Sequence, residues 1–232
     1  MELYQYQWVD FFATKGLKYL LILGFWLALF PFWKLLMGPA RRVSLIVSKA
    51  IEALSGWFNF PQTLYYHQGH TWAKVEDGLV KVGLDDFAQK LLGRPDAIEL
   101  PLIGGKVRQG DIGWRIRIEG KTLEMLSPVS GEVLAINKKV LEDPSLILKD
   151  PYGEGWLLKI KPDELKVDLR NLLKGETLKG WIQGTIDRLR GRLGGELGLM
   201  YQDGGLPVSG FVRMIDPQNW EQIAREFLIP EE

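Results

Sequence analysis

His67 and His70 are the only histidines of the chain, and their H-x-x-H spacing could hold a metal ion on a helix. No cysteine and no third nearby ligand accompany them. Their setting, Tyr-Tyr-His-Gln-Gly-His-Thr-Trp, is typical of the entry to a strand. We therefore expect a structural role for both histidines and no metal site.

Other residue patterns that could do catalytic chemistry are weak. The chain has no cysteine, which excludes disulfides, cysteine nucleophiles and thiolate metal sites within it. Asp85-Asp86 fits a helix start better than a catalytic carboxylate pair. The glycines at Gly104-Gly105 and Gly153-Glu154-Gly155 do not stand between a strand and a helix, as a phosphate-binding loop would. We predict that the chain has no catalytic residues and is not an enzyme.

The stretch from Gly104 to Asn137 predicts a β-hairpin with a lysine at its tip. We expect Gly120 and Lys121 to form a two-residue turn in which the glycine supplies the positive φ. Glu119 then faces Thr122, Ile118 faces Leu123 and Ile116 faces Met125, and the amine of Lys121 lies in water at the apex. This register puts one set of residues on a single apolar face: Trp114, Ile116, Ile118, Leu123 and Met125.

The hairpin and its neighbours resemble the biotinyl/lipoyl carrier fold, and specifically the glycine cleavage system H protein. The resemblance covers residues 66–176. It is carried by ordered matches along the chain: His70-Thr71-Trp72, Val82-Gly83-Leu84-Asp85-Asp86-Phe87-Ala88-Gln89, Leu92-Gly93, Glu99-Leu100-Pro101, Ser127-Pro128-Val129-Ser130-Gly131-Glu132-Val133, Asn137, and Asp150 to Leu157. The resemblance implies a mainly β fold with flanking helices, an H-protein-like lipoyl/biotinyl hybrid (barrel-sandwich) domain. It also implies lipoate on an exposed hairpin lysine, for which Lys121 is the candidate.

The position of that lysine departs from the family pattern, in which the modified residue lies eight residues before the proline of Pro-Val-Ser-Gly. Lys121 lies seven residues before Pro128 and follows Glu-Gly. This shifted position leaves two possible functions for the domain. The first, which we favour from the sequence, is an unmodified scaffold or accessory subunit of a membrane complex, plausibly a redox complex, without a cofactor. The alternative is a true carrier with lipoate on Lys121 and the glycine cleavage enzymes as partners.

The N-terminal region predicts attachment to a membrane. From Leu17 to Met37 the only charged residues are Lys18 and Lys34, and about 20 apolar residues suffice to cross a bilayer. More basic residues follow this span than precede it, so we expect a single pass in the inner (cytoplasmic) membrane with the β domain in the cytoplasm. Ala40 to Phe60 has the spacing of an amphipathic helix, suited to lipid headgroups or to a partner subunit.

Balanced charge argues against nucleic acid as a partner, because the formal net charge is +0. We predict four regions: an N-terminal segment with a transmembrane helix (1–38), a juxtamembrane helix (39–61), the H-protein-like domain (62–176) and a helical C-terminal extension (177–232). The expected elements are hairpin strands at 71–75 and 79–82, strands at 97–100, 132–136 and 156–160, and helices at 84–92, 163–174 and 181–193. Gly93 and Gly175 are the expected stops of the first two helices. A final helix begins at Asp216-Pro217, and its buried face is Trp220, Ile223, Ala224, Phe227 and Leu228.

Overall fold

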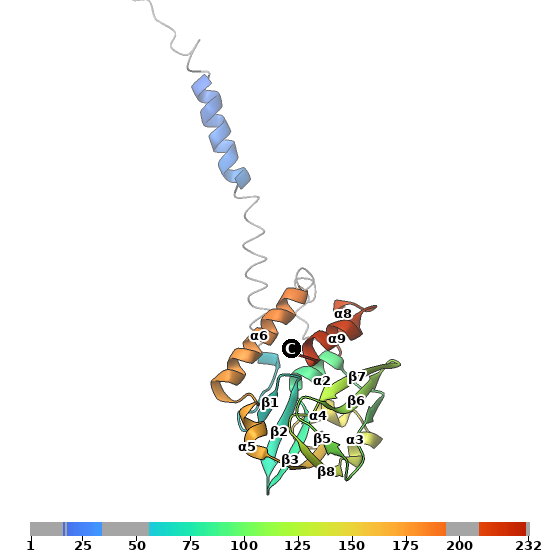
Figure 1. Ribbon diagram of the computed structural model, residues 1–232. Coiled ribbons are helices and arrows are strands. Elements are labelled where there is room, and N and C mark those ends of the chain that lie inside the picture. Colours follow the sequence, from blue (N-terminus) through green and yellow to red (C-terminus); the bar gives the residue numbers. More distant parts are fainter. Residues whose placement is uncertain (1–15, 17, 34–55, 194–208, 231–232) are drawn as a thin grey trace, which may run out of the picture. The chain divides into compact units, whose positions relative to one another are not determined.

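The computed structural model describes residues 16, 18–33, 56–193 and 209–230 (Figure 1). The chain divides into two compact units, Met1–Lys49 and Ala50–Glu232, and each is described by itself. In the first unit a helix covers residues 18–33, and its side chains are almost all exposed. The predicted helix of residues 40–60 lies outside the described residues except at its end.

The predicted transmembrane helix is not supported. Over the described parts of the chain, no helix combines the length and the hydropathy that crossing a membrane requires. The described helix of residues 18–33 is shorter than the predicted span of 17–37.

Two antiparallel sheets form the centre of the second unit. The larger has the strand order β1-β2-β3-β9-β8-β5 and the smaller has the order β4-β6-β7. The strands are β1 (Tyr65–His67), β2 (Thr71–Glu76), β3 (Leu79–Leu84), β4 (Ala97–Glu99), β5 (Lys106–Val107), β6 (Ile112–Ile118), β7 (Lys121–Leu126), β8 (Gly131–Ile136) and β9 (Leu158–Pro162). The prediction of a mainly β domain with flanking helices is confirmed.

The helices of this unit lie between and around the sheets (Figure 1). They are α2 (Asp86–Leu92), α3 (Lys138–Glu142), α4 (Leu146–Lys149), α5 (Leu165–Arg170), α6 (Gly175–Leu193), α8 (Val212–Ile215) and α9 (Trp220–Leu228). The helix start predicted at Asp85-Asp86 is confirmed, and Asp85 is the cap of α2: its side chain accepts a hydrogen bond from the amide of Ala88, and Gly93 ends the helix.

The C-terminal half of the chain differs from the prediction in the bounds of three helices. The predicted helix of 163–174 shortens to α5, and Gly175, expected as its stop, is the first residue of α6. Helix α9 begins at Trp220 rather than at Asp216-Pro217. The cause is a turn: the Asp216 carboxylate accepts hydrogen bonds from the amides of Gln218 and Asn219 before the helix starts.

One hydrophobic core joins the sheets to the C-terminal helices. Trp114, Ile116 and Met125 of the smaller sheet are buried in the same cluster as Phe87 of α2 and Phe227 of α9. All five residues predicted for the buried face of α9 are buried. The C-terminal extension is therefore packed on the β domain, not appended to it.

Candidate functional site

The hairpin of β6 and β7 places the candidate lysine. The two strands alternate buried and exposed residues, and the buried set is the predicted one: Trp114, Ile116, Ile118, Leu123 and Met125. β7 is an edge strand of the smaller sheet, in which it pairs with β6 on one side only. The hairpin thus has one face fixed by the core and one end free of it.

The predicted register of this hairpin is wrong by two residues. Ile118 pairs with Lys121 and Ile116 pairs with Leu123, so the turn is Glu119-Gly120 rather than Gly120-Lys121. Both turn residues have positive φ, 50° at Glu119 and 76° at Gly120, which matches a type I′ turn. Lys121 is consequently the first residue of β7 and not a turn residue.

The Lys121 side chain lies at the solvent-exposed end of the hairpin. It is 56% exposed, and its Nζ lies 3.3 Å from a carboxylate oxygen of Glu221 on α9. Glu221 also pairs with Arg225, 2.9 Å away, and these cations hold the pKa of the Glu221 carboxyl below its ordinary value, Arg225 contributing most. A primary amine at this place can be reached from solvent and acylated.

The Pro-Val-Ser-Gly segment fixes the base of the hairpin. The Ser127 hydroxyl donates to the carbonyl of Val129 at 2.7 Å, and the amide of Ser130 donates to the buried Asp168 carboxylate of α5 at 2.8 Å. A Cβ atom on Gly131 would lie 2.1 Å from the carbonyl oxygen of Lys161. Only glycine fits where β8 begins against β9.

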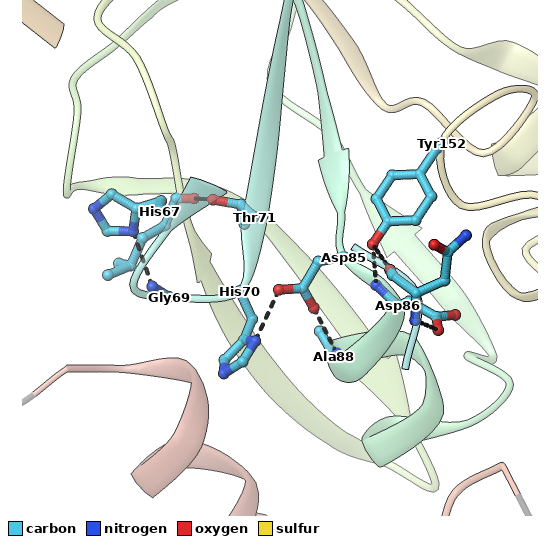
Figure 2. Close-up of polar contacts among 10 residues, drawn as sticks. His67, Gly69, His70, Thr71, Asp85, Asp86, Ala88 and Tyr152 are labelled. Atoms are coloured by element: carbon cyan, nitrogen blue, oxygen red, sulfur yellow. Dashed lines mark hydrogen bonds and ion pairs between the residues drawn. The ribbon is translucent and has the colours of Figure 1, made fainter. Parts of the chain in front are cut away.

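The two histidines do not converge on a common point (Figure 2). His67 Nδ1 accepts a hydrogen bond from the amide of Gly69, and burial lowers the pKa of His67 to about 4, with a smaller contribution from His70. His70 lies 2.8 Å from Asp85, the same carboxylate that caps α2. These contacts support the structural role predicted for both.

His70 also joins α2 to the helices outside the β domain. Its ring is fully buried and stacks on Phe87 with ring centres 4.4 Å apart, while Trp181 of α6 lies 4.5 Å away. The buried His70–Asp85 pair links residues 15 positions apart, and no local sequence pattern indicates it.

A second polar cluster holds the N-terminal end of α2, and it was also not predicted. The amide of Asp86 donates to the Tyr152 hydroxyl at 2.9 Å, and that hydroxyl donates to the carbonyl of Asn59 at 2.6 Å (Figure 2). The amide of Asn59 in turn donates to the Asp86 carboxylate at 2.7 Å. Burial, followed by the charge of Asp85, raises the pKa of Tyr152 far above its ordinary value, so the phenol stays protonated and serves as a structural hydrogen-bonding group.

Comparison with known proteins gives a consistent result. The family model described as glycine cleavage H-protein matches residues 64–184. A probable glycine cleavage system H protein of Thermococcus gammatolerans is 39% identical over 129 residues, which are 55% of this chain and 96% of the relative. The glycine cleavage system H protein of Bacteroides thetaiotaomicron is 36% identical over 126 residues, 54% of this chain and 99% of the relative.

A crystal structure of the Mycobacterium marinum glycine cleavage system H protein superposes with a TM-score of 0.47 and 28% identity, covering 52% of this chain and 97% of that one. The matched family model spans more than half of the chain, and the sequence relatives are covered almost completely. The chain therefore belongs to the glycine cleavage H-protein family.

Proposed function

We propose that the chain is a lipoyl carrier of the glycine cleavage type, with lipoate attached as an amide to Nζ of Lys121. The observation that carries the proposal is the place of Lys121: it directly follows the two-residue turn of a hairpin, with 56% of its side chain exposed. This function is the alternative among the sequence-based interpretations. The similarity extends over almost the full length of the related H proteins, and it favours the carrier over the scaffold.

The residues around Lys121 fit such a group. On attachment the lysine loses its charge, which costs the ion pair with Glu221, and an exposed pair of this kind contributes about 0–1 kcal/mol. Glu221 keeps its contact with Arg225, so no charge is left without a partner. Bound lipoate would supply a dithiolane that carries a group or electrons between catalytic partners, and the chain's own part is to hold the attachment point rigidly on β6 and β7.

The partners proposed for this carrier are the glycine cleavage enzymes. Two catalytic partners can share one carrier only if the arm reaches both, which a lysine on a protruding hairpin permits. The rigid base of the hairpin, held by Ser127, Ser130 and Asp168, keeps the attachment point at a defined distance from the body of the domain.

Attachment can be tested with the purified full chain, lipoate, ATP and a lipoate–protein ligase. We expect the intact mass to rise by one lipoyl group, and we expect this rise to be lost in Lys121→Arg. Lys106→Arg, a change at another exposed lysine, is the matched control and should leave the mass rise unchanged. An unmodified wild-type chain, under conditions that load an H protein of known activity, would refute the proposal.

The unmodified scaffold subunit remains the second candidate, and a specific feature favours it: Lys121 lies seven residues before Pro128, one fewer than the family pattern. In that case the hairpin would serve only as a contact surface for other subunits of a membrane complex. The same mass measurement separates the two functions.

Membrane attachment through the N-terminal helix belongs to this proposal as well. Within residues 18–33 the large apolar side chains are exposed, among them Leu21, Trp26, Leu27 and Phe30. Fractionation of cells that express the full chain tests it: recovery in carbonate-washed membranes supports attachment, and recovery in the supernatant contradicts it.

A further inference from the structure

Helices α8 and α9 contact the tip of the β6–β7 hairpin at three successive points. Arg213 lies 3.3 Å from Glu119 in the turn, and Glu221 lies 3.3 Å from Lys121. Arg225 donates to the carbonyl oxygen of Thr122 at 2.9 Å. Figure 1 shows α9, in red, beside β7. Glu119, Lys121 and Thr122 thus each have a partner from the C-terminal extension.

These contacts come from an element that is itself firmly placed. α9 buries Trp220, Ile223 and Phe227 in the main core. Just before α8, the amide of Gly210 donates to the carbonyl of Lys90 at 2.7 Å, and Arg213 donates to the carbonyl of Leu92 at 2.9 Å. The polar side of α9 is therefore held against the hairpin by apolar packing on its opposite side.

The backbone geometry explains the role of Arg225. β7 is an edge strand, and edge strands leave alternate carbonyl and amide groups without a strand partner. Arg225 pairs with such a carbonyl, at Thr122, while it also binds Glu221. Of the paired side chains of α9, Arg225 thus binds the edge of β7 and Glu221 binds Lys121.

We propose that Glu221 is a positioning residue that restrains the amine of Lys121 and slows its acylation. The proposal rests on the proposed role of Lys121 as the attachment site. Acylation needs the neutral amine: the ammonium first releases one proton to solvent, and the lone pair of Nζ then forms a bond to the acyl carbon of an activated lipoyl ester. The bond from that carbon to the leaving group breaks, the leaving group departs with the electron pair, and the second proton of the nitrogen is released to solvent. Glu221 binds the ammonium and holds Nζ against α9, so the approach of the amine to the ester is disfavoured. Helix α9 lies outside residues 64–184, so this control belongs to the C-terminal extension and not to the matched family domain.

The first test uses chemical labelling, which does not depend on lipoate being the natural cargo. The folded full chain is treated with a small excess of an acetyl ester of N-hydroxysuccinimide, and labelling at Lys121 is compared by peptide mass spectrometry with labelling at Lys106, which is 75% exposed. In Glu221→Gln we expect the Lys121/Lys106 ratio to rise about 2- to 5-fold at low salt, the range that an exposed ion pair accounts for. The difference should shrink at 1 M salt, because salt screens surface ion pairs.

Two further variants separate positioning from folding. Glu226→Gln removes another ion-paired carboxylate of the same helix, the partner of Arg192, and should leave the Lys121 ratio unchanged. Glu221→Asp keeps the charge and should restore at least part of the restraint. An unchanged ratio in Glu221→Gln at low salt, or an equal rise in Glu226→Gln, would overturn the proposal.

A second measurement follows enzymatic lipoylation of the same variants. We expect the rate for Glu221→Gln to exceed that of the wild type by a similar factor. If chemical labelling responds and no variant is lipoylated, the restraint stands and the carrier function fails. If lipoylation occurs at Lys121 and labelling does not respond to Glu221→Gln, the carrier function stands and the restraint fails.

Discussion

At the scale of single residues, the buried polar groups that hold the fold differ clearly from Lys121, the proposed attachment site. His70, Asp85 and Tyr152 are buried or engaged in polar contacts that fix α2. Lys121 lies at an exposed hairpin end, and its one close charged partner among the described residues is Glu221. A side chain that is to carry a mobile group must avoid the interior, and Lys121 meets that condition.

His67 makes the stability of the domain depend on pH. Burial lowers its pKa to about 4 from 6.5, so between these values the unfolded chain binds a proton that the folded chain does not. The stabilisation is complete above pH 6.5 and is lost as the pH falls toward 4, up to about 3 kcal/mol. Chemical denaturation between pH 7 and 5 measures it.

The matched variant is His67→Asn, whose side-chain oxygen can still accept the hydrogen bond from the Gly69 amide but does not titrate. We expect its free energy of unfolding to vary less between pH 7 and 5 than that of the wild type. Equal slopes in the two proteins would contradict the assignment.

Much of the residue-level description could be predicted from local sequence. The helix start at Asp85-Asp86 and the stop at Gly93 are short-range features, and both were predicted correctly. The His70–Asp85 pair and the Lys121–Glu221 pair join residues 15 and 100 positions apart, and no local pattern indicates either. The chemical neighbours of the candidate lysine therefore became known only from the fold.

At the scale of elements, the hairpin of β6 and β7 marks the limit of pattern-based prediction. The alternation of apolar residues correctly gave its buried face, but a shift of two residues keeps every side chain on the same face. Alternation cannot distinguish such registers, and only the turn can. The turn uses Glu119 at a φ of 50°, a conformation that non-glycine residues seldom adopt, so the sequence favoured the wrong pair.

A substitution at Gly131 would test how closely β8 and β9 must approach each other to support that hairpin. An added Cβ would meet the carbonyl oxygen of Lys161 at 2.1 Å, and because this neighbour is backbone it cannot move aside cheaply. We expect Gly131→Ala to lower the free energy of unfolding by about 3 kcal/mol. Gly180→Ala is the control, because α6 leaves open space there, and it should stabilise by roughly 0.5–1 kcal/mol. Urea denaturation compares both with the wild type, and a Gly131→Ala variant as stable as the wild type would show that the strands tolerate separation.

At the scale of the whole molecule, family membership and the C-terminal extension together define the protein. The glycine cleavage H-protein family consists of non-catalytic lipoyl carriers, which confirms that the chain is not itself an enzyme. The extension beyond residue 184 includes α9, which shares its core with the β domain. The predicted division at residues 176 and 177 stays a prediction, and the shared core favours cooperative folding across it.

Phe227 provides a direct test of that cooperativity. Its ring is buried, with its centre 5.5 Å from that of Phe87, so it joins α9 to α2. We expect Phe227→Ala to cost about 3–5 kcal/mol and to lower the melting temperature of the whole domain by roughly 10 °C in one transition. Met214→Ala, at a half-exposed site on α8, should change it little. A separate early transition with the main melt unchanged would mean that the extension folds independently.

The central claim is that Lys121 carries lipoate, and the intact mass of the full chain isolated from its own cells tests it most directly. The account predicts a mass increased by one lipoyl group, located on the peptide that contains Lys121 and lost in Lys121→Ala. An unmodified chain, in cells whose other lipoyl proteins are loaded, would contradict it.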